Sequence, residues 1–371
     1  FGQGFLQFQN ITYQPLDIFL PVGISFFTFQ TISYVIDVYR GRIDPLRRWI
    51  DYVFYVSFFP QLVAGPIVRA RDFIPQIYRT PVVTRAEFGE GLFLVLCGLF
   101  KKTVISDYIS LNFVDRIFDA PLLYTGVENL LGVYGYALQI YCDFSGYSDM
   151  AIGLGKMFGF DFMENFNYPY ISTSIREFWR RWHISLSTWF REYLYIPLGG
   201  NRKGQVRTYV NLLIVFFATG LWHGAGATFI IWGLYHGLFL VVERMGLGKL
   251  LEKNCFRGLN HIYTALVVVV GWVFFRADTL ADAKVILHQM FTWENGIYPA
   301  SLFVNRKVIF LAVLGVLFSG IVQSICPKLR EHLYEKEVTR TVDIVIMAVL
   351  LFLCTMYLVS STYNPFIYFR F

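Results

Sequence analysis

The stretch Thr208–Val242, TYVNLLIVFFATGLWHGAGATFIIWGLYHGLFLVV, contains two apolar runs on either side of the small residues Gly224-Ala225-Gly226. Each run, 208–224 and 226–242, has about the 17 to 25 residues that an α-helix needs to cross some 30 Å of hydrocarbon. The stretch therefore predicts two consecutive membrane-spanning helices, with the ionisable side chain of His223 where the first one ends.

The composition of the whole chain agrees with a membrane location. Of its 371 residues, 56% are hydrophobic, 19% aromatic and 16% charged, and the mean hydropathy is +0.49. One soluble core could not bury this much apolar surface. Further apolar runs occur at 18–38, 88–106, 129–155, 262–277, 308–325 and 343–363. We expect an all-α integral membrane protein with eight spans, in a single domain over 1–371.

A shorter apolar piece at 51–68 lies between two loops rich in arginine. Because loops rich in Lys and Arg stay in the cytoplasm, both flanks should be cytoplasmic, and the piece should be a re-entrant hairpin. The acidic connection 107–128 is expected outside and the basic loop 243–257 inside. This topology places the segment 156–207 on the cytoplasmic side and His223 toward the outer end of its helix.

The segment 156–207 is too aromatic for a plain loop and too basic to span lipid, so it should enter the protein from the cytoplasmic side. Its cations could attract anionic lipid or hold a phosphorylated donor. Pro197, Gly199, Gly200 and Asn201 predict a turn at its end. The basic side chains are Arg176, Arg180, Arg181, Arg191, Arg202, Lys203 and Arg207.

Two histidines are candidates for proton transfer. An imidazole such as His223 is well suited to take a proton from a hydroxyl near neutral pH, and the glycines around it would let backbone or substrate approach closely. His183, among several tryptophans, could position an acyl carbonyl or its attacking oxygen. The alternative for both is a packed core histidine, and for His236 we favour that structural role.

Asp143 and Asp149 lie in the apolar run 129–155, where carboxylates need partners. We expect ion pairs with an arginine of 176–191; the alternative is that they orient a catalytic imidazole. The five cysteines show no metal-binding spacing, and we interpret them as small core residues. No metal and no bound cofactor is expected.

Six ordered motifs give the chain a family resemblance. They are PVGISFFTFQ (21–30), FPQLVAGPI (59–67), DFSGYSD (143–149), the Arg180–Gly200 stretch, LWHG (221–224) and YNPFIY (363–368). In these motifs the chain resembles the membrane-bound O-acyltransferases, and among them the alginate O-acetyltransferase-type proteins of bacterial polysaccharide export. The chain begins at Phe1 without a Met, and we expect that helices preceding it in the family are missing.

The resemblance implies a ring of tilted helices around a central tunnel in a bacterial inner membrane. It implies that His223 is the catalytic histidine and that His183 occupies the second active-site position, where many eukaryotic relatives have Asn. It also implies an extracytoplasmic partner of the SGNH-hydrolase-like acyltransferase type. The residues expected to bind donor or substrate are Trp222, Arg180, Arg181, Trp182, Arg202, Lys203, Asp149 and Tyr147.

The expected reaction transfers an acyl group, most simply from acetyl-CoA, to a hydroxyl on a polysaccharide or on the partner protein. His223 would act as general base while His183 orients the reactants. The alternatives are D-alanyl transfer to teichoic acid from a carrier protein, a non-enzymatic transporter or export channel, and a structural scaffold. The chain shows no repeated pair of broken helices of the kind that transporters often have.

Overall fold

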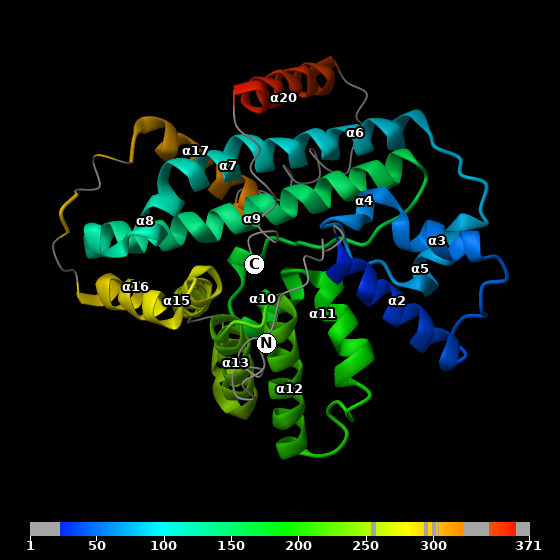
Figure 1. The fold of residues 1–371 in the computed structure, drawn as a ribbon, viewed down its shortest axis with the longest axis horizontal. Coiled ribbons are helices and arrows are strands. Elements are labelled where there is room, and N and C mark those ends of the chain that lie inside the picture. Colours follow the sequence, from blue (N-terminus) through cyan, green and yellow to red (C-terminus); the bar gives the residue numbers. More distant parts are fainter. Residues whose placement is uncertain are drawn as a thin grey trace, which may run out of the picture.

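The computed structural model describes residues 23–253, 257–292, 296–298, 302, 304–321 and 341–360 (Figure 1). Nearly all of these residues are helical, and no strand is formed among them apart from one isolated bridge between Tyr124 and Tyr298. The prediction of an all-α fold is confirmed. The parts of the motifs at 21–30 and 363–368 that fall before Gly23 and after Ser360 lie outside the described residues.

Two long helices run side by side across the molecule in opposite directions (Figure 1). The first, α6 (Arg85–Phe100), continues through η1 (Lys101–Ser106), α7 (Asp107–Ile109), η2 (Ser110–Val114) and α8 (Asp115–Asp119); the second is α9 (Gly126–Met157). Capping boxes begin α6 at Thr84 and α9 at Thr125. The two backbones come close because glycines face each other at Gly91 and Gly153, and again at Gly98 and Gly146.

The predicted pair of helices in the opening stretch is present. It consists of α12 (Gln205–His223) and α13 (Ala227–Val242), and α15 (Arg257–Arg276) packs against α13. Gly220 of α12 faces the backbone of Phe229, and Gly233 of α13 faces the backbone of Phe216. The glycines near His223 thus serve the approach of one helix to another.

The N-terminal part contains α2 (Ile24–Tyr39) and three short helices, α3 (Trp49–Ser57), α4 (Phe59–Leu62) and α5 (Ala70–Ile77). The helices α3 and α4 fall in the apolar piece at 51–68, which the sequence predicts to be a hairpin, and α5 follows that piece. They enclose a small hydrophobic cluster that includes Tyr55, Phe58 and Phe73. This cluster is separate from the main core.

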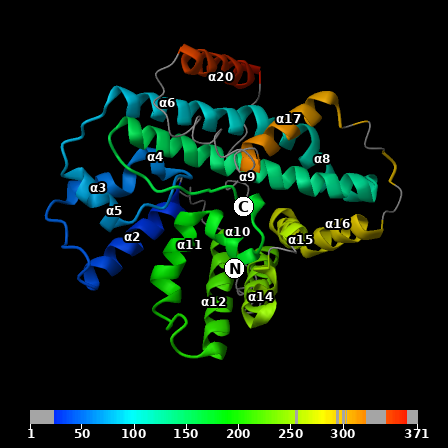
Figure 2. The ribbon, with the colours of Figure 1, turned by 180° about the vertical axis from the view of Figure 1, so that it is seen from behind.

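The segment 156–207 is folded into the interior, as predicted. It forms η4 (Pro169–Ile171), α10 (Ile175–Arg181), α11 (Ile184–Phe190), η5 (Arg191–Tyr195) and the expected turn, with positive φ angles at Gly199 and Gly200. In the view from behind (Figure 2), α10 and α11 lie between the α6–α9 layer and the lower helices.

Helices from several parts of the chain surround α10 and α11. Ring contacts connect Trp189 to α2, Trp182 to α9 and α15, and Trp179 to α12 and α13. The basic segment therefore supplies the centre of a ring of helices, while a tunnel through this ring stays a prediction.

Three of the described helices are long and apolar enough to cross a bilayer by themselves: 227–251, 257–276 and 341–360. The first comprises α13, η6 (Glu243–Leu247) and α14 (Gly248–Leu251); the last is α20 (Thr341–Ser360), whose residues are almost all exposed. Such an apolar surface suits contact with lipid tails. The number of spans stays a prediction.

The remaining elements are η3 (Pro121–Leu123), α16 (Leu280–Thr292), α17 (Arg306–Val316) and η9 (Leu317–Ile321). The apolar runs do not predict α16. Cys97, Cys142 and Cys354 are free and buried, in agreement with the core role expected for them, whereas Cys255 and Cys326 lie outside the described residues.

Candidate active site

His223 is the last residue of α12, and only 9% of its surface is exposed. Its imidazole is surrounded by aromatic rings, with centroids 4.7 Å away in Trp222, 5.1 Å in Trp232 and 5.0 Å in Phe275. The polar ring therefore lies in an apolar setting, where water is largely excluded and electrostatic interactions are strong.

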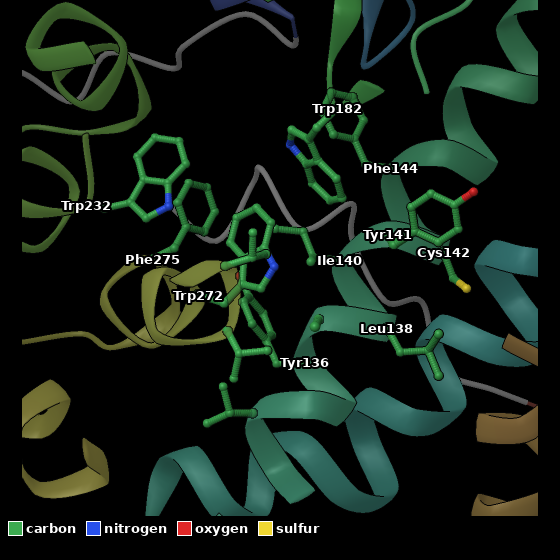
Figure 3. Packing of buried hydrophobic residues seen from close by; sticks show 14 of the residues in the cluster. Tyr136, Leu138, Ile140, Tyr141, Cys142, Phe144, Trp182, Trp232, Trp272 and Phe275 are labelled. Atoms are coloured by element: carbon green, nitrogen blue, oxygen red, sulfur yellow. The ribbon is translucent and has the colours of Figure 1, made fainter. Parts of the chain in front are cut away.

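An aromatic core supports this end of α12. Trp232 of α13 and Phe275 of α15 have centroids 4.9 Å apart, and Trp272 lies 4.9 Å from Trp182 of the α10–α11 turn. Figure 3 shows Trp232 and Phe275 close together on one side of this core and Tyr141 of α9 on the other. Large, rigid rings of this kind hold neighbouring side chains in fixed positions.

His183 lies at the turn between α10 and α11 and is 1% exposed. Its backbone has the left-handed conformation, with φ 44° and ψ 57°, which is strained for a residue other than glycine. Its Nδ1 lies 3.1 Å from Oδ1 of Asn165, and its Nε2 has no hydrogen-bond partner among the described residues. No motif in the sequence points to Asn165.

Trp222 connects the two histidines. Its ring centroid lies 4.7 Å from that of His223 and 6.3 Å from that of His183, and it also contacts Phe26 and Phe29 of α2. The fold thus brings both predicted catalytic histidines into ring contact with the same indole, that of Trp222. This juxtaposition agrees with a shared site.

A cleft of about 620 Å³ lies beside this site. Its polar mouth includes Arg176, Arg180, Arg191 and Arg244, and its apolar wall reaches Thr219, one helical turn before His223. Arg176, Arg180 and Arg244 form no ion pair within the described part of the chain. Their charges are therefore available to an anionic ligand.

A second cleft, of about 660 Å³, lies on the other side of α10 and shares Arg176 and Arg180 with the first. It also contains acidic groups, among them Glu177, which pairs with Arg181 at 2.9 Å. Burial raises the pKa of Glu177, but hydrogen bonds from Thr173 and Arg181 outweigh this effect and hold that pKa below its ordinary value. The charge of Arg181 is thus balanced by the Glu177 carboxylate, whereas Arg180 has no such ion pair among the described residues.

The other predicted binding residues lie in different surroundings. Trp182 is buried and stacks on Phe178. Arg202 and Lys203 are exposed in the turn after η5, whereas Asp149 and Tyr147 of α9 are half-buried, and none of the four lines either cleft. A donor-binding role for these four residues stays a prediction.

The expected ion pairs between the α9 carboxylates and an arginine of 176–191 are wrong. Lys102 lies 2.6 Å from Asp143 and 2.7 Å from Asp107, and Lys101 lies 2.5 Å from Asp149. These lysines are on η1, which packs directly along α9, whereas the arginines lie on the other face of the core. Within the described residues, an amide rather than either carboxylate contacts the His183 ring.

Known proteins resemble this chain over most of its length. The model of the membrane-bound O-acyltransferase family matches residues 48–281. A probable alginate O-acetylase of Pseudomonas aeruginosa is 50% identical over 75% of this chain and 53% of its own length. The peptidoglycan O-acetyltransferase of Helicobacter pylori is 36% identical, over 97% of this chain and 76% of its own length.

A more distant relative is the teichoic acid D-alanyltransferase of Bacillus subtilis, which is 30% identical over 73% of this chain and 70% of its own length. The chain spans about half the length of the alginate O-acetylases that it matches. The resemblance seen in the sequence motifs is confirmed, and the chain belongs to the membrane-bound O-acyltransferase family.

Proposed function

We propose that the protein moves an acyl group, acetyl in the simplest case, from a cytoplasmic thioester to a hydroxyl on the other side of a bacterial inner membrane. The observation that carries this proposal is the pair of buried imidazoles, His183 and His223, around Trp222 beside an arginine-lined cleft. Membership of a family of O-acyltransferases supports acyl transfer as the reaction, and the arginine-lined cleft supports an anionic donor.

The proposed donor is acetyl-CoA. Its phosphates would bind Arg176, Arg180 and Arg244, which line the first cleft, because one guanidinium group can donate two parallel hydrogen bonds to a phosphate. The apolar wall toward Thr219 would take the flexible thioester arm. Trp222 and Trp182 would then exclude water from the thioester.

In the proposed reaction, His223 removes the proton of the acceptor hydroxyl as its oxygen attacks the thioester carbonyl. The carbon–sulfur bond breaks, and the leaving thiolate receives the proton from the imidazolium of His223. The products are an ester and a free thiol, so His223 returns to its neutral state. His183 orients the reactants by a hydrogen bond.

The proposed acceptor is an exopolysaccharide hydroxyl, or a hydroxyl of an SGNH-hydrolase-like partner outside the membrane that completes the transfer. The names of the relatives that acetylate alginate or peptidoglycan support a polysaccharide acceptor. D-alanyl transfer to teichoic acid is the second candidate, favoured by one relative with that name. It requires a carrier protein as donor in place of acetyl-CoA.

The test is acyl transfer by the protein in nanodiscs with acetyl-CoA, acceptor and partner, comparing the wild type with His223→Ala and His223→Gln. We expect both variants to lose turnover by about a hundredfold or more, the contribution of a general base. Equal folding of the variants is checked by their melting temperatures. Unchanged turnover in both would exclude His223 as the base, and transfer only from a D-alanyl carrier protein would establish the second candidate.

A further inference from the structure

Three nitrogen and oxygen atoms lie within hydrogen-bond distance of one oxygen beside His183. Oδ1 of Asn165 lies 3.2 Å from the backbone nitrogen of Ser185, 2.9 Å from its hydroxyl and 3.1 Å from Nδ1 of His183. Nδ2 of Asn165 donates to the hydroxyl of Ser148 at 3.0 Å. All of these residues are buried.

This network determines which ring nitrogen of His183 carries the proton. A backbone N–H can only donate, so the Asn165 atom that faces Ser185 must be the amide oxygen. The Ser185 hydroxyl accepts from the backbone N–H of Ile67 at 3.0 Å and gives its own proton to Asn165. Nδ1 of His183 therefore also faces an acceptor and must donate to it.

We infer that Asn165 is a positioning residue that holds neutral His183 in the tautomer protonated at Nδ1, which leaves Nε2 as a hydrogen-bond acceptor for a second O–H of the acceptor substrate, beside the hydroxyl whose proton His223 removes. The inference rests on the proposed function and narrows it. Because an unprotonated Nε2 cannot donate a hydrogen bond to the thioester carbonyl, His183 positions the acceptor substrate rather than the thioester.

The burial of Nε2 supports a ligand at this atom. His183 is 1% exposed, and Nε2 has no hydrogen-bond partner within the described residues. Buried polar atoms are nearly always hydrogen-bonded, and one left without a partner has a cost of about 1–3 kcal/mol. A substrate O–H close to Trp222 would satisfy this nitrogen.

The backbone around His183 fixes the ring further. The amide of Ile184 donates to the carbonyl oxygen of Asn165 at 2.9 Å, and the amide of Asn167 donates to that of Arg181 at 2.9 Å. These two bonds hold the left-handed turn at His183 from both sides. The same residue, Asn165, therefore holds both the main chain and the imidazole.

The first test is a ¹⁵N spectrum of histidine-labelled protein in nanodiscs, with the His183 signals identified by their loss in His183→Ala. We expect one protonated nitrogen, Nδ1, and one unprotonated nitrogen, Nε2, in the wild type and in Ser148→Ala, which removes only the donor contact of Asn165. A protonated Nε2 in neutral His183 would overturn the inference. This readout needs no turnover, so it is independent of the proposed function.

The second test compares two substitutions of Asn165. Asn165→Leu removes the acceptor, and we expect mixed tautomers and a kcat lower by about ten- to a hundredfold. Asn165→Asp keeps an acceptor at Nδ1, so kcat should recover to within severalfold of wild type. The new carboxylate also favours the imidazolium of His183, so the acid limb of the pH–rate profile should move to higher pH.

The Asn165→Asp variant keeps this test decisive if Asn165→Leu fails to fold. An active Asn165→Asp protein with an unshifted pH profile would show that His183 does not act in turnover and would overturn the inference. Activity lost in His223→Ala together with the expected tautomer at His183 would leave both proposals standing. An inactive wild type with that same tautomer would contradict only the proposed function.

Discussion

At the scale of single residues, the buried ion pairs between η1 and α9 lead to a stability prediction. Lys102 faces both Asp107 and Asp143, at 2.7 and 2.6 Å, with little solvent around it. Lys102→Met would leave two carboxylates buried without this cation. We expect a loss of about 3–5 kcal/mol, the usual cost of breaking a buried pair from one side, seen as a lower melting temperature in detergent.

A double variant, Lys102→Met with Asp143→Asn, is the matched control. It removes the carboxylate that lies deepest together with its cation, so part of the lost stability should return. If the single variant melts like the wild type, the ion pair has no stabilising role. If the double variant melts below the single one, Asp143 has a stabilising partner other than Lys102.

The residues themselves differ in how far the sequence could identify them. His223 and His183 stand out because an imidazole in an apolar run or among tryptophans is unusual. Asn165 carries no such signal, since an amide in a loop acquires its role only when the chain brings Ser185 and His183 to it. For Asp143 and Asp149 the density of arginines in 176–191 favours the wrong partners, because the lysines of η1, which follows α6, pack on α9.

At the scale of elements, the contact between α6 and α9 depends on glycine. A Cβ built on Gly98 would meet the carbonyl oxygen of Gly146 and lie 2.9 Å from the backbone nitrogen of Met150. Gly98→Ala must therefore push the helices apart, and we expect a loss of about 1–3 kcal/mol. Gly258→Ala on α15 is the control, because nothing lies within 4 Å of its Cβ. That variant should be neutral or slightly stabilised.

The melting temperatures of Gly98→Ala, Gly258→Ala and the wild type, measured in the same detergent, test this expected difference in stability. Equal melting temperatures for Gly98→Ala and the wild type would show that α6 and α9 can separate at no cost. The comparison matters for the site because α9 carries Ser148, which accepts from Asn165. A displaced α9 should therefore also lower acyl transfer.

The elements predicted best are those with long apolar runs, such as α12, α13 and α15, because an apolar run of the length that crosses a bilayer marks a whole helix. The hydropathy pattern gives no sign of α16, whose 13 residues are too few to span a bilayer and include the charged Asp282 and Lys284 near their start. The composition of 156–207 indicates that this segment enters the protein. The positions of α10 and α11 do not follow from the sequence, because their aromatic contacts come from five separate helices.

At the scale of the whole molecule, long-range contacts join the N-terminal helices to the wall of the arginine-lined cleft. Glu192 of η5 pairs with Arg69 at 2.8 Å and with Arg71 at 2.5 Å, while Trp189 of α11 donates to the carbonyl oxygen of Phe29 on α2. Arg69 and Arg71 thus form ion pairs with Glu192, whereas Arg180 forms none among the described residues. The cationic side chains of 176–207 differ in position, because Arg180 lines the cleft and Arg202 does not.

This division gives a prediction that separates cations inside the cleft from those outside it. Arg180→Ala should raise the KM for acetyl-CoA by about tenfold, the loss of one charge-assisted phosphate contact worth roughly 1.5 kcal/mol. Arg202→Ala, in the exposed turn that lines neither cleft, is the matched control and should leave KM unchanged. The KM for a short acetyl thioester without phosphates should not change in either variant, because that donor offers Arg180 no anion. Equal effects of Arg180→Ala and Arg202→Ala on acetyl-CoA would instead assign the basic segment a diffuse attraction for anionic lipid, which raised salt would weaken in both variants alike.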